Sequence, residues 1–286
     1  MVSVKPIFLL AGLVLILPIT SPGRPAPERS AVAHGSLFAQ ASARALNQDF
    51  ADLDISFLLV DAHTGELLAS RWDKFDTPIP LGSLAKPFAA FAYGEQHDFH
   101  YPAHTCRGSQ TGCWRPGGHG GVDLVSAIAY SCNSYFRVLT NDLSAADLSP
   151  TASRFGIELP DGQASGMELA GLGLRWKIAP LRMALAYLEL LRNRDNPGVA
   201  LILRGMERSG RQGTGAEVDR ALLPGSALVK TGTAACTHVP HAPGDGFAVA
   251  LAPAEDPRVL LMVRVHGVPG SQAARTAGQM LRRIKE

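Results

Sequence analysis

The chain has 286 residues, of which 46% are hydrophobic, and a formal net charge of +2. A chain of this size and apolar content can bury a substantial core. The small charge is not gathered into a basic cluster, which argues against a protein that binds nucleic acid.

An apolar run at residues 7–19 follows Lys5 near the N-terminus. It is shorter than the roughly 20 residues that span a bilayer, so residues 1–21 predict an export signal, with an uncleaved signal anchor as the alternative. Residues 22–35 are rich in proline and predict a tether. We therefore expect one globular domain at 36–286, exported to the periplasm and either released or anchored to the inner membrane.

The domain begins with a predicted helix and a predicted hairpin. Apolar residues at helical spacing mark residues 37–50. A buried strand at 55–60, a turn at 63–65 and a returning strand at 67–70 follow.

Ser83 and Lys86 stand three residues apart in the segment Leu-Gly-Ser-Leu-Ala-Lys-Pro. If a helix starts here, both side chains emerge on one face, within reach of each other. A serine nucleophile must pass its proton to a base whose pKa lies near the pH of the medium, and Lys86 in a first helical turn suits that role. Pro87 disfavours a helical Lys86, so we expect a tight turn at 83–86 and a regular helix from Pro87. The alternative is a plain helix start, with Ser83 as cap and Lys86 in solvent.

A second polar pair ends the next predicted helix. Residues 97–121 predict an irregular loop rich in Gly, His and Cys, and residues 122–130 predict a helix that delivers Ser131 and Asn133 at its end. Taken alone, such a pair is also ordinary at the end of a helix.

The C-terminal part predicts three strands at 227–234, 247–252 and 259–265, and an amphipathic helix at 272–284. The first strand carries Lys230-Thr231-Gly232-Thr233. Gly232 has a physical reason in this strand, because a side chain there would block a substrate peptide from pairing along the strand edge.

The order Ser83-x-x-Lys86, Ser131-x-Asn133, Lys230-Thr231-Gly232 resembles the signature of the serine penicillin-recognising enzymes. From about residue 36 to 285 the chain is similar to the transpeptidase domain of penicillin-binding proteins. Residues 169–191 resemble a Gly-x-Gly and Thr-Pro-Leu segment of that family, although a usual Gln is missing and Ala179 replaces Thr. The resemblance implies an α/β (α+β) fold of the DD-peptidase and β-lactamase type. In that fold a mostly antiparallel sheet is flanked by helices, with an inserted helical subdomain.

The resemblance also implies a role for each motif. Ser83 would be the nucleophile and Lys86 its base, Ser131 would relay protons, and Asn133 would bond the lysine and the substrate amide. Lys230 would offer a fixed positive charge to a substrate carboxylate, with the hydroxyls of Thr231 and Thr233 as donors. The backbone N–H groups of Ser83 and Thr233 would form the oxyanion hole.

The implied function is a serine DD-peptidase that acts on D-Ala-D-Ala peptidoglycan stems through an acyl-enzyme and needs no cofactor for catalysis. The implied partners are peptidoglycan stem peptides, β-lactams and cell-wall synthesis proteins. A transpeptidase and a carboxypeptidase would use the same groups, so both stay open. A β-lactam or muropeptide sensor that does not turn over is one alternative, and a serine β-lactamase is another. Neither Glu168 nor Glu189 lies in the Glu-x-x-Leu-Asn loop of class A β-lactamases, and class D enzymes usually have Val in place of Asn133.

The remaining candidate site is formed by Cys106, Cys113, His119 and Cys132. If Ser131 and Asn133 face a cleft, the thiol of Cys132 points away from it, toward the loop that carries the other three. Three thiols and one imidazole are the ligands of a closed structural zinc site. The segment also resembles elongation-type penicillin-binding proteins, some of which hold zinc there with Asp, His and Cys. A disulfide between Cys106 and Cys113 is the alternative in an exported protein. We expect Cys236 to be a buried free thiol outside this set.

Overall fold

The computed structural model describes Met1 and residues 36–236, 241 and 244–285. Almost all of the predicted signal at 1–21 and the predicted tether at 22–35 lie outside the described residues, and both stay predictions. The described residues from 36 onward group into one compact unit. Within the described ranges, no helix combines the length and the apolar character needed to cross a bilayer.

A five-stranded antiparallel sheet forms the centre of this unit, with the strand order β2-β1-β9-β8-β7. Its strands are β1 (Ile55–Asp61), β2 (Leu67–Arg71), β7 (Leu228–Ala234), β8 (Asp245–Ala252) and β9 (Val259–Val265). The third motif therefore lies on β7, at one edge of the sheet.

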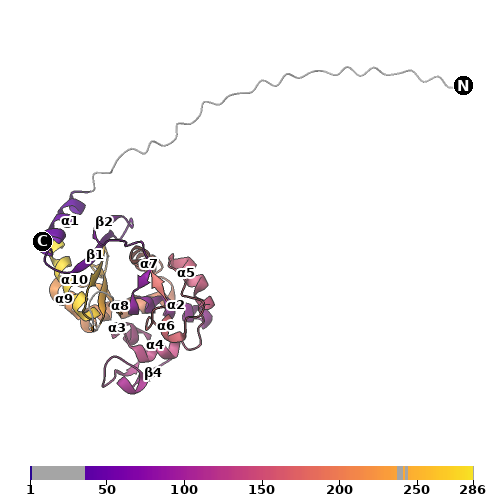
Figure 1. Ribbon diagram of the computed structural model, residues 1–286. Coiled ribbons are helices and arrows are strands. Elements are labelled where there is room, and N and C mark those ends of the chain that lie inside the picture. Colours follow the sequence, from indigo (N-terminus) through magenta and orange to yellow (C-terminus); the bar gives the residue numbers. More distant parts are fainter. Residues whose placement is uncertain (2–35, 237–240, 242–243, 286) are drawn as a thin grey trace. The chain divides into compact units, whose positions relative to one another are not determined.

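Side chains alternate between the two faces of the sheet, and both faces are covered (Figure 1). On one face, α1 (Leu37–Asp49), α9 (Ala216–Leu222) and α10 (Gly270–Lys285) pack over Phe57 of β1 and its neighbours. Leu58 and the next alternate residues belong to a second core, which continues into the helical part of the chain. Because both faces are buried, the central strands read as nearly continuous apolar runs.

The chain between β2 and α9 forms the predicted helical insertion. Its α-helices are α2 (Lys86–Gln96), α3 (Leu124–Ala129), α4 (Asn133–Leu139), α5 (Ser149–Phe155), α6 (Gly166–Leu169), α7 (Pro180–Arg192) and α8 (Pro197–Gln212). Two short ladders accompany them: β3 (Ile79–Pro80) with β6 (Lys177–Ile178), and β4 (His104–Cys106) with β5 (Gly120–Val122). The predicted mixed fold with an antiparallel sheet and an inserted helical subdomain is confirmed.

Two predicted segments differ from the structure. The loop at 97–121 is more regular than expected, because its two ends pair as β4 and β5. The helix predicted at 122–130 begins only at Leu124, since Asp123 is its N-cap and accepts a hydrogen bond from the backbone N–H of Ser126.

Candidate active site

The turn that carries Ser83 is a 3₁₀ segment, Gly82–Ala85, and α2 follows from Lys86. The helix thus starts one residue before the predicted Pro87, whose missing N–H is harmless in a first turn. Gly82 has φ +59, and a Cβ there would lie 2.1 Å from the carbonyl oxygen of Thr233. Only glycine lets this turn approach β7 so closely.

Ser83 lines a cavity of about 390 Å³ at the edge of the sheet, together with Ser131, Asn133 and three residues of β7. The fully buried Tyr187 supports the turn from beneath by donating its hydroxyl to the carbonyl of Leu84 at 2.9 Å. The structure therefore brings all three motifs to one cavity.

Lys86 is completely buried, which excludes the alternative of a solvated side chain. Its amine donates to Oδ1 of Asn133 at 2.5 Å and to the carbonyl of Ser131 at 3.2 Å. Burial lowers the pKa of Lys86 to about 7, against a smaller opposing effect of Cys132 and Cys113. Burial is thus the main cause, whereas the sequence pointed to the place of Lys86 in a first helical turn. An amine with this pKa can take up a proton at neutral pH.

Ser131 has a left-handed backbone, with φ +49, although it carries a side chain. Such a conformation costs about 1–2 kcal/mol for a residue other than glycine. Its hydroxyl oxygen accepts a hydrogen bond from Lys230 at 3.0 Å, while its carbonyl accepts from Lys86. Ser131 therefore links the two lysines.

Lys230 is also completely buried, and its amine donates to Ser131 and to the carbonyl of Thr231. Burial first, and the charge of Lys86 second, hold the pKa of Lys230 well below its usual value. The fixed positive charge that we expected Lys230 to offer to a substrate carboxylate stays a prediction. In this geometry Lys230 orients Ser131.

The other three residues of the third motif, Thr231, Gly232 and Thr233, each contact a different neighbouring segment. A Cβ at Gly232 would lie 2.5 Å from the carbonyl oxygen of Leu81. The glycine is thus required by the packing of β7 against the serine turn, whereas we expected it to make room for substrate. Thr231 donates to Oγ1 of Thr214 at 2.6 Å, and the exposed Thr233 accepts from the backbone N–H of Gly270 at 3.0 Å.

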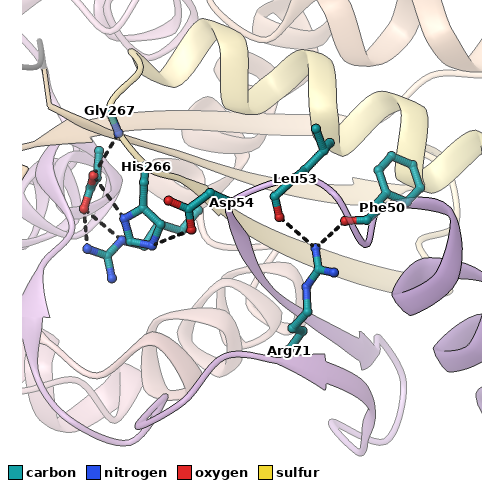
Figure 2. Close-up of polar contacts among 8 residues, drawn as sticks. Phe50, Leu53, Asp54, Arg71, His266 and Gly267 are labelled. Atoms are coloured by element: carbon teal, nitrogen blue, oxygen red, sulfur yellow. Dashed lines mark hydrogen bonds and ion pairs between the residues drawn. The ribbon is translucent and has the colours of Figure 1, made fainter. Parts of the chain in front are cut away.

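A polar network fixes the turn at His266 and Gly267 (Figure 2), which leads into α10 and Gly270. The buried Asp245 accepts hydrogen bonds from the Nε of Arg264 at 2.9 Å and from the backbone N–H of Gly267 at 3.2 Å. Nδ1 of His266 lies 3.4 Å from Asp245. Burial raises the pKa of Asp245, but hydrogen bonds from Cys236 and Arg264 outweigh it and leave that pKa below its usual value. The carboxylate therefore anchors the connection from β9 to the cavity wall.

The four predicted metal ligands lie together behind Ser131 and Asn133. Cys106, Cys113, His119 and Cys132 have all their ligand atoms within 4.8 Å of one another. The three cysteines are buried, and His119 is half-buried. None of Cys106, Cys113 and Cys132 forms a disulfide in the structure. The prediction that Cys236 is buried is wrong, because its side chain is half-buried at the end of β7.

Sequence reasoning did not find several residues of the cavity wall: Trp114, Leu172, Thr214, Pro269, Gly270 and Ser271. Trp114, Leu172, Thr214 and Pro269 come from loops between elements, where no periodic pattern indicates the direction of a side chain, whereas Gly270 and Ser271 begin α10. Trp114 and Leu172 had a signal: Trp114 is an aromatic residue directly after Cys113 in a glycine-rich loop, and Leu172 is the middle residue of the Gly-x-Gly segment.

Residues 55–286 match the family model described as the penicillin binding protein transpeptidase domain. No curated protein sequence matches the chain. Among solved structures it is similar to PBP2 of Pseudomonas aeruginosa in complex with WCK 5153, with a TM-score of 0.68 and 19% identity over 87% of this chain and 73% of that one. The complex of Helicobacter pylori PBP2 with MreC gives a TM-score of 0.73 and 17% identity over 85% and 62% of the two chains. The transpeptidase domain of FtsI4 from Legionella pneumophila gives a TM-score of 0.63 and 18% identity over 89% and 97%.

Proposed function

This chain belongs to the penicillin-binding protein transpeptidase family, and we propose that it is a serine DD-peptidase that cleaves D-Ala-D-Ala stem peptides through an acyl-enzyme. The observation that carries the proposal is the buried amine of Lys86, whose pKa of about 7 matches the task of a base at neutral pH. Ser83 precedes it by three residues and borders the cavity.

In the proposed reaction, Oγ of Ser83 attacks the carbonyl carbon of the penultimate D-Ala, and its proton passes to neutral Lys86. The backbone N–H groups of Ser83 and Thr233 stabilise the oxyanion of the tetrahedral intermediate. The C–N bond then breaks, and the proton returns through the hydroxyl of Ser131 to the leaving D-Ala amine. An amine of a second stem, or water, finally attacks the ester on Ser83 and releases the enzyme. β-Lactams acylate Ser83 by the same attack, and the resulting ester is not released.

Two assays on the pure protein test this function. Fluorescent penicillin should label the wild type and fail to label folded Ser83→Ala. A D-Ala-D-Ala pentapeptide should release D-Ala, and an amine acceptor distinguishes transpeptidation from the free acid of a carboxypeptidase. Labelling without any turnover would favour a sensor, and rapid hydrolysis of penicillin would favour a β-lactamase. A folded wild type that is neither labelled nor active on the pentapeptide would overturn the proposal.

We further propose that Cys106, Cys113, His119 and Cys132 hold a structural zinc ion. Zinc bound tetrahedrally, with Zn–S of about 2.3 Å and Zn–N of about 2.0–2.1 Å, needs S···S edges of about 3.8 Å and S···N edges of about 3.5 Å. Nδ1 of His119 lies 3.6 Å from Sγ of Cys106 and 3.5 Å from Sγ of Cys113. Sγ of Cys113 lies 3.9 Å from Sγ of Cys132. The donor set thus fits the ion, which would fix the loop behind Ser131 without entering the reaction.

The proposed place of action is outside the cytoplasmic membrane, because the apolar run at 7–19 is typical of an export signal or anchor. A cell-wall synthesis protein is the proposed partner. The similar PBP2 of H. pylori was solved as a complex with MreC, which supports a partner of this kind.

A further inference from the structure

Two consecutive residues of the cysteine-rich loop contact the two residues that flank Ser131. Sγ of Cys113 lies 3.9 Å from Sγ of Cys132, on the C-terminal side. The indole N–H of Trp114 donates to the carbonyl of Tyr130 at 3.1 Å, on the N-terminal side. The loop thus holds the chain immediately before and immediately after Ser131.

The contact of Trp114 acts on the peptide unit that sets the backbone of Ser131. A peptide bond is planar, so the carbonyl of Tyr130 and the nitrogen of Ser131 move as one plate, and its orientation determines φ of Ser131. Tyr130 is the C-cap of α3, where helix carbonyls lack a partner within the helix. The indole supplies that partner, while the N–H at the other end of the plate donates to the carbonyl of Ile128 at 3.2 Å.

This plate needs support because Ser131 is held at φ +49, a conformation that persists only where its surroundings determine it. The side chain of Tyr130 has contacts of its own. Its ring stacks on His119 with centroids 5.4 Å apart, and the guanidinium of Arg208 lies 5.3 Å from its centroid. These contacts fix the ring, whereas the bond from Trp114 is directed at the backbone.

We propose that Trp114 is a positioning residue, which keeps Ser131 in its left-handed conformation and thereby keeps the hydroxyl and carbonyl of Ser131 on Lys230 and Lys86. This inference rests on the proposed acyl transfer, in which Ser131 relays the proton. Trp114 also borders the cavity, with 54% of the residue accessible. The inference adds a second role, the support of the Ser131 backbone.

The test compares Trp114→Phe, which keeps an aromatic ring and loses the N–H, with a matched control. Trp176 also donates its indole N–H to a backbone carbonyl, that of Glu158 at 2.8 Å, and it does not border the cavity. Trp176→Phe therefore deletes the same kind of bond elsewhere. Acylation by penicillin is resolved into the binding constant of the probe and the rate constant of acylation. Amide hydrogen exchange of the peptide that covers 130–133 is measured without any ligand.

Trp114→Phe should lower the acylation rate constant at least about fivefold, the equivalent of one lost hydrogen bond, and leave probe binding unchanged. It should also speed exchange at 130–133, whereas Trp176→Phe changes neither. Unchanged exchange and rate in Trp114→Phe, or a loss confined to probe binding, would overturn the proposal. If Trp114→Phe does not fold, the benzothiophene analogue of tryptophan at position 114 makes the same deletion with the ring size kept. Should the wild type itself not be acylated, the proposed function fails, and the exchange data alone decide the role of Trp114.

Discussion

The amine of Lys86 lies 2.5 Å from Oδ1 of Asn133, so a hydrogen bond across 47 positions of the chain joins the first motif to the second. The bond is formed in the interior, where the amine has no contact with solvent. Its acceptor begins α4, directly after the Ser131-Cys132 step that the cysteine-rich loop holds. The position of the Lys86 amine therefore depends on that loop.

The rate of acylation should depend on pH through Lys86. Burial lowers the pKa of its amine to about 7, and only the neutral amine can accept the proton of Ser83. The rate constant should rise about tenfold per pH unit below pH 7 and level off by about pH 8. Stopped-flow acylation between pH 5 and pH 9 measures this. A profile that keeps rising toward pH 10 would point to an amine with the pKa of an ordinary lysine.

Lys86→Arg should lower acylation at least about 100-fold, the usual contribution of a general base. Arginine keeps the positive charge, but its guanidinium stays protonated and cannot accept the proton. Lys177→Arg, on the exposed surface of β6, is the matched control and should acylate like the wild type. Retained acylation in Lys86→Arg would reduce Lys86 to a structural cation.

Gly82→Ala should lower the free energy of unfolding by about 2–4 kcal/mol and abolish acylation. The substitution combines a left-handed backbone with a collision against the carbonyl of Thr233. Gly156→Ala separates the two causes, because Gly156 also has a positive φ (+66), but a Cβ there meets nothing within 4 Å. This control should cost only about 1–2 kcal/mol, the strain by itself. Urea unfolding measures both, and equal losses would contradict the close approach of the turn to β7.

Asp245→Asn should reduce the stability of the protein at pH 7 by about 1–3 kcal/mol, the range for removing one partner of a buried charged network. The folded state lowers the pKa of this carboxyl, so its contribution is present above the unfolded pKa of about 3.9 and is lost as the pH falls through the lower folded value. The stability of Asp245→Asn should therefore not show this loss as the pH falls.

Asp54→Asn is the control for this prediction, since Asp54 is exposed and lies 3.9 Å from the same His266. Its stability at pH 7 should stay within about 0.5 kcal/mol of the wild type. Thermal unfolding between pH 2 and pH 7 gives all three curves. Parallel curves for Asp245→Asn and the wild type would show that the carboxylate does not anchor the turn before α10.

Protein purified without chelator should contain about one zinc ion per chain. Cys132→Ser should lose the metal because it removes a thiolate of the proposed set, whereas Cys236→Ser should keep it. Elemental analysis measures the metal, and thiol titration counts the cysteines that the metal protects. A mapped disulfide between Cys106 and Cys113 in metal-free protein would contradict the zinc site.

The amino-acid sequence by itself determined the elements and the three motifs. The continuous apolar strands, the helix at 37–50 and the amphipathic C-terminal helix follow from spacings of two and of 3.6 residues, which are local properties. Ser83, Ser131 and Lys230 could be placed in one family by their order alone. Even the ligand types of the proposed zinc site could be read from the sequence, because Cys and His carry their chemistry wherever they lie.

Only the tertiary structure decided how these groups act on one another. The lowered pKa of Lys86 comes from burial, and burial depends on which helices cover the amine. Lys230 turns to Ser131 across 99 positions, and Gly232 is required by the carbonyl of Leu81. Trp114 reaches the peptide unit before Ser131 only because β4 and β5 fold the loop back. Desolvation and contacts between distant segments arise from packing, which no local spacing of residues specifies.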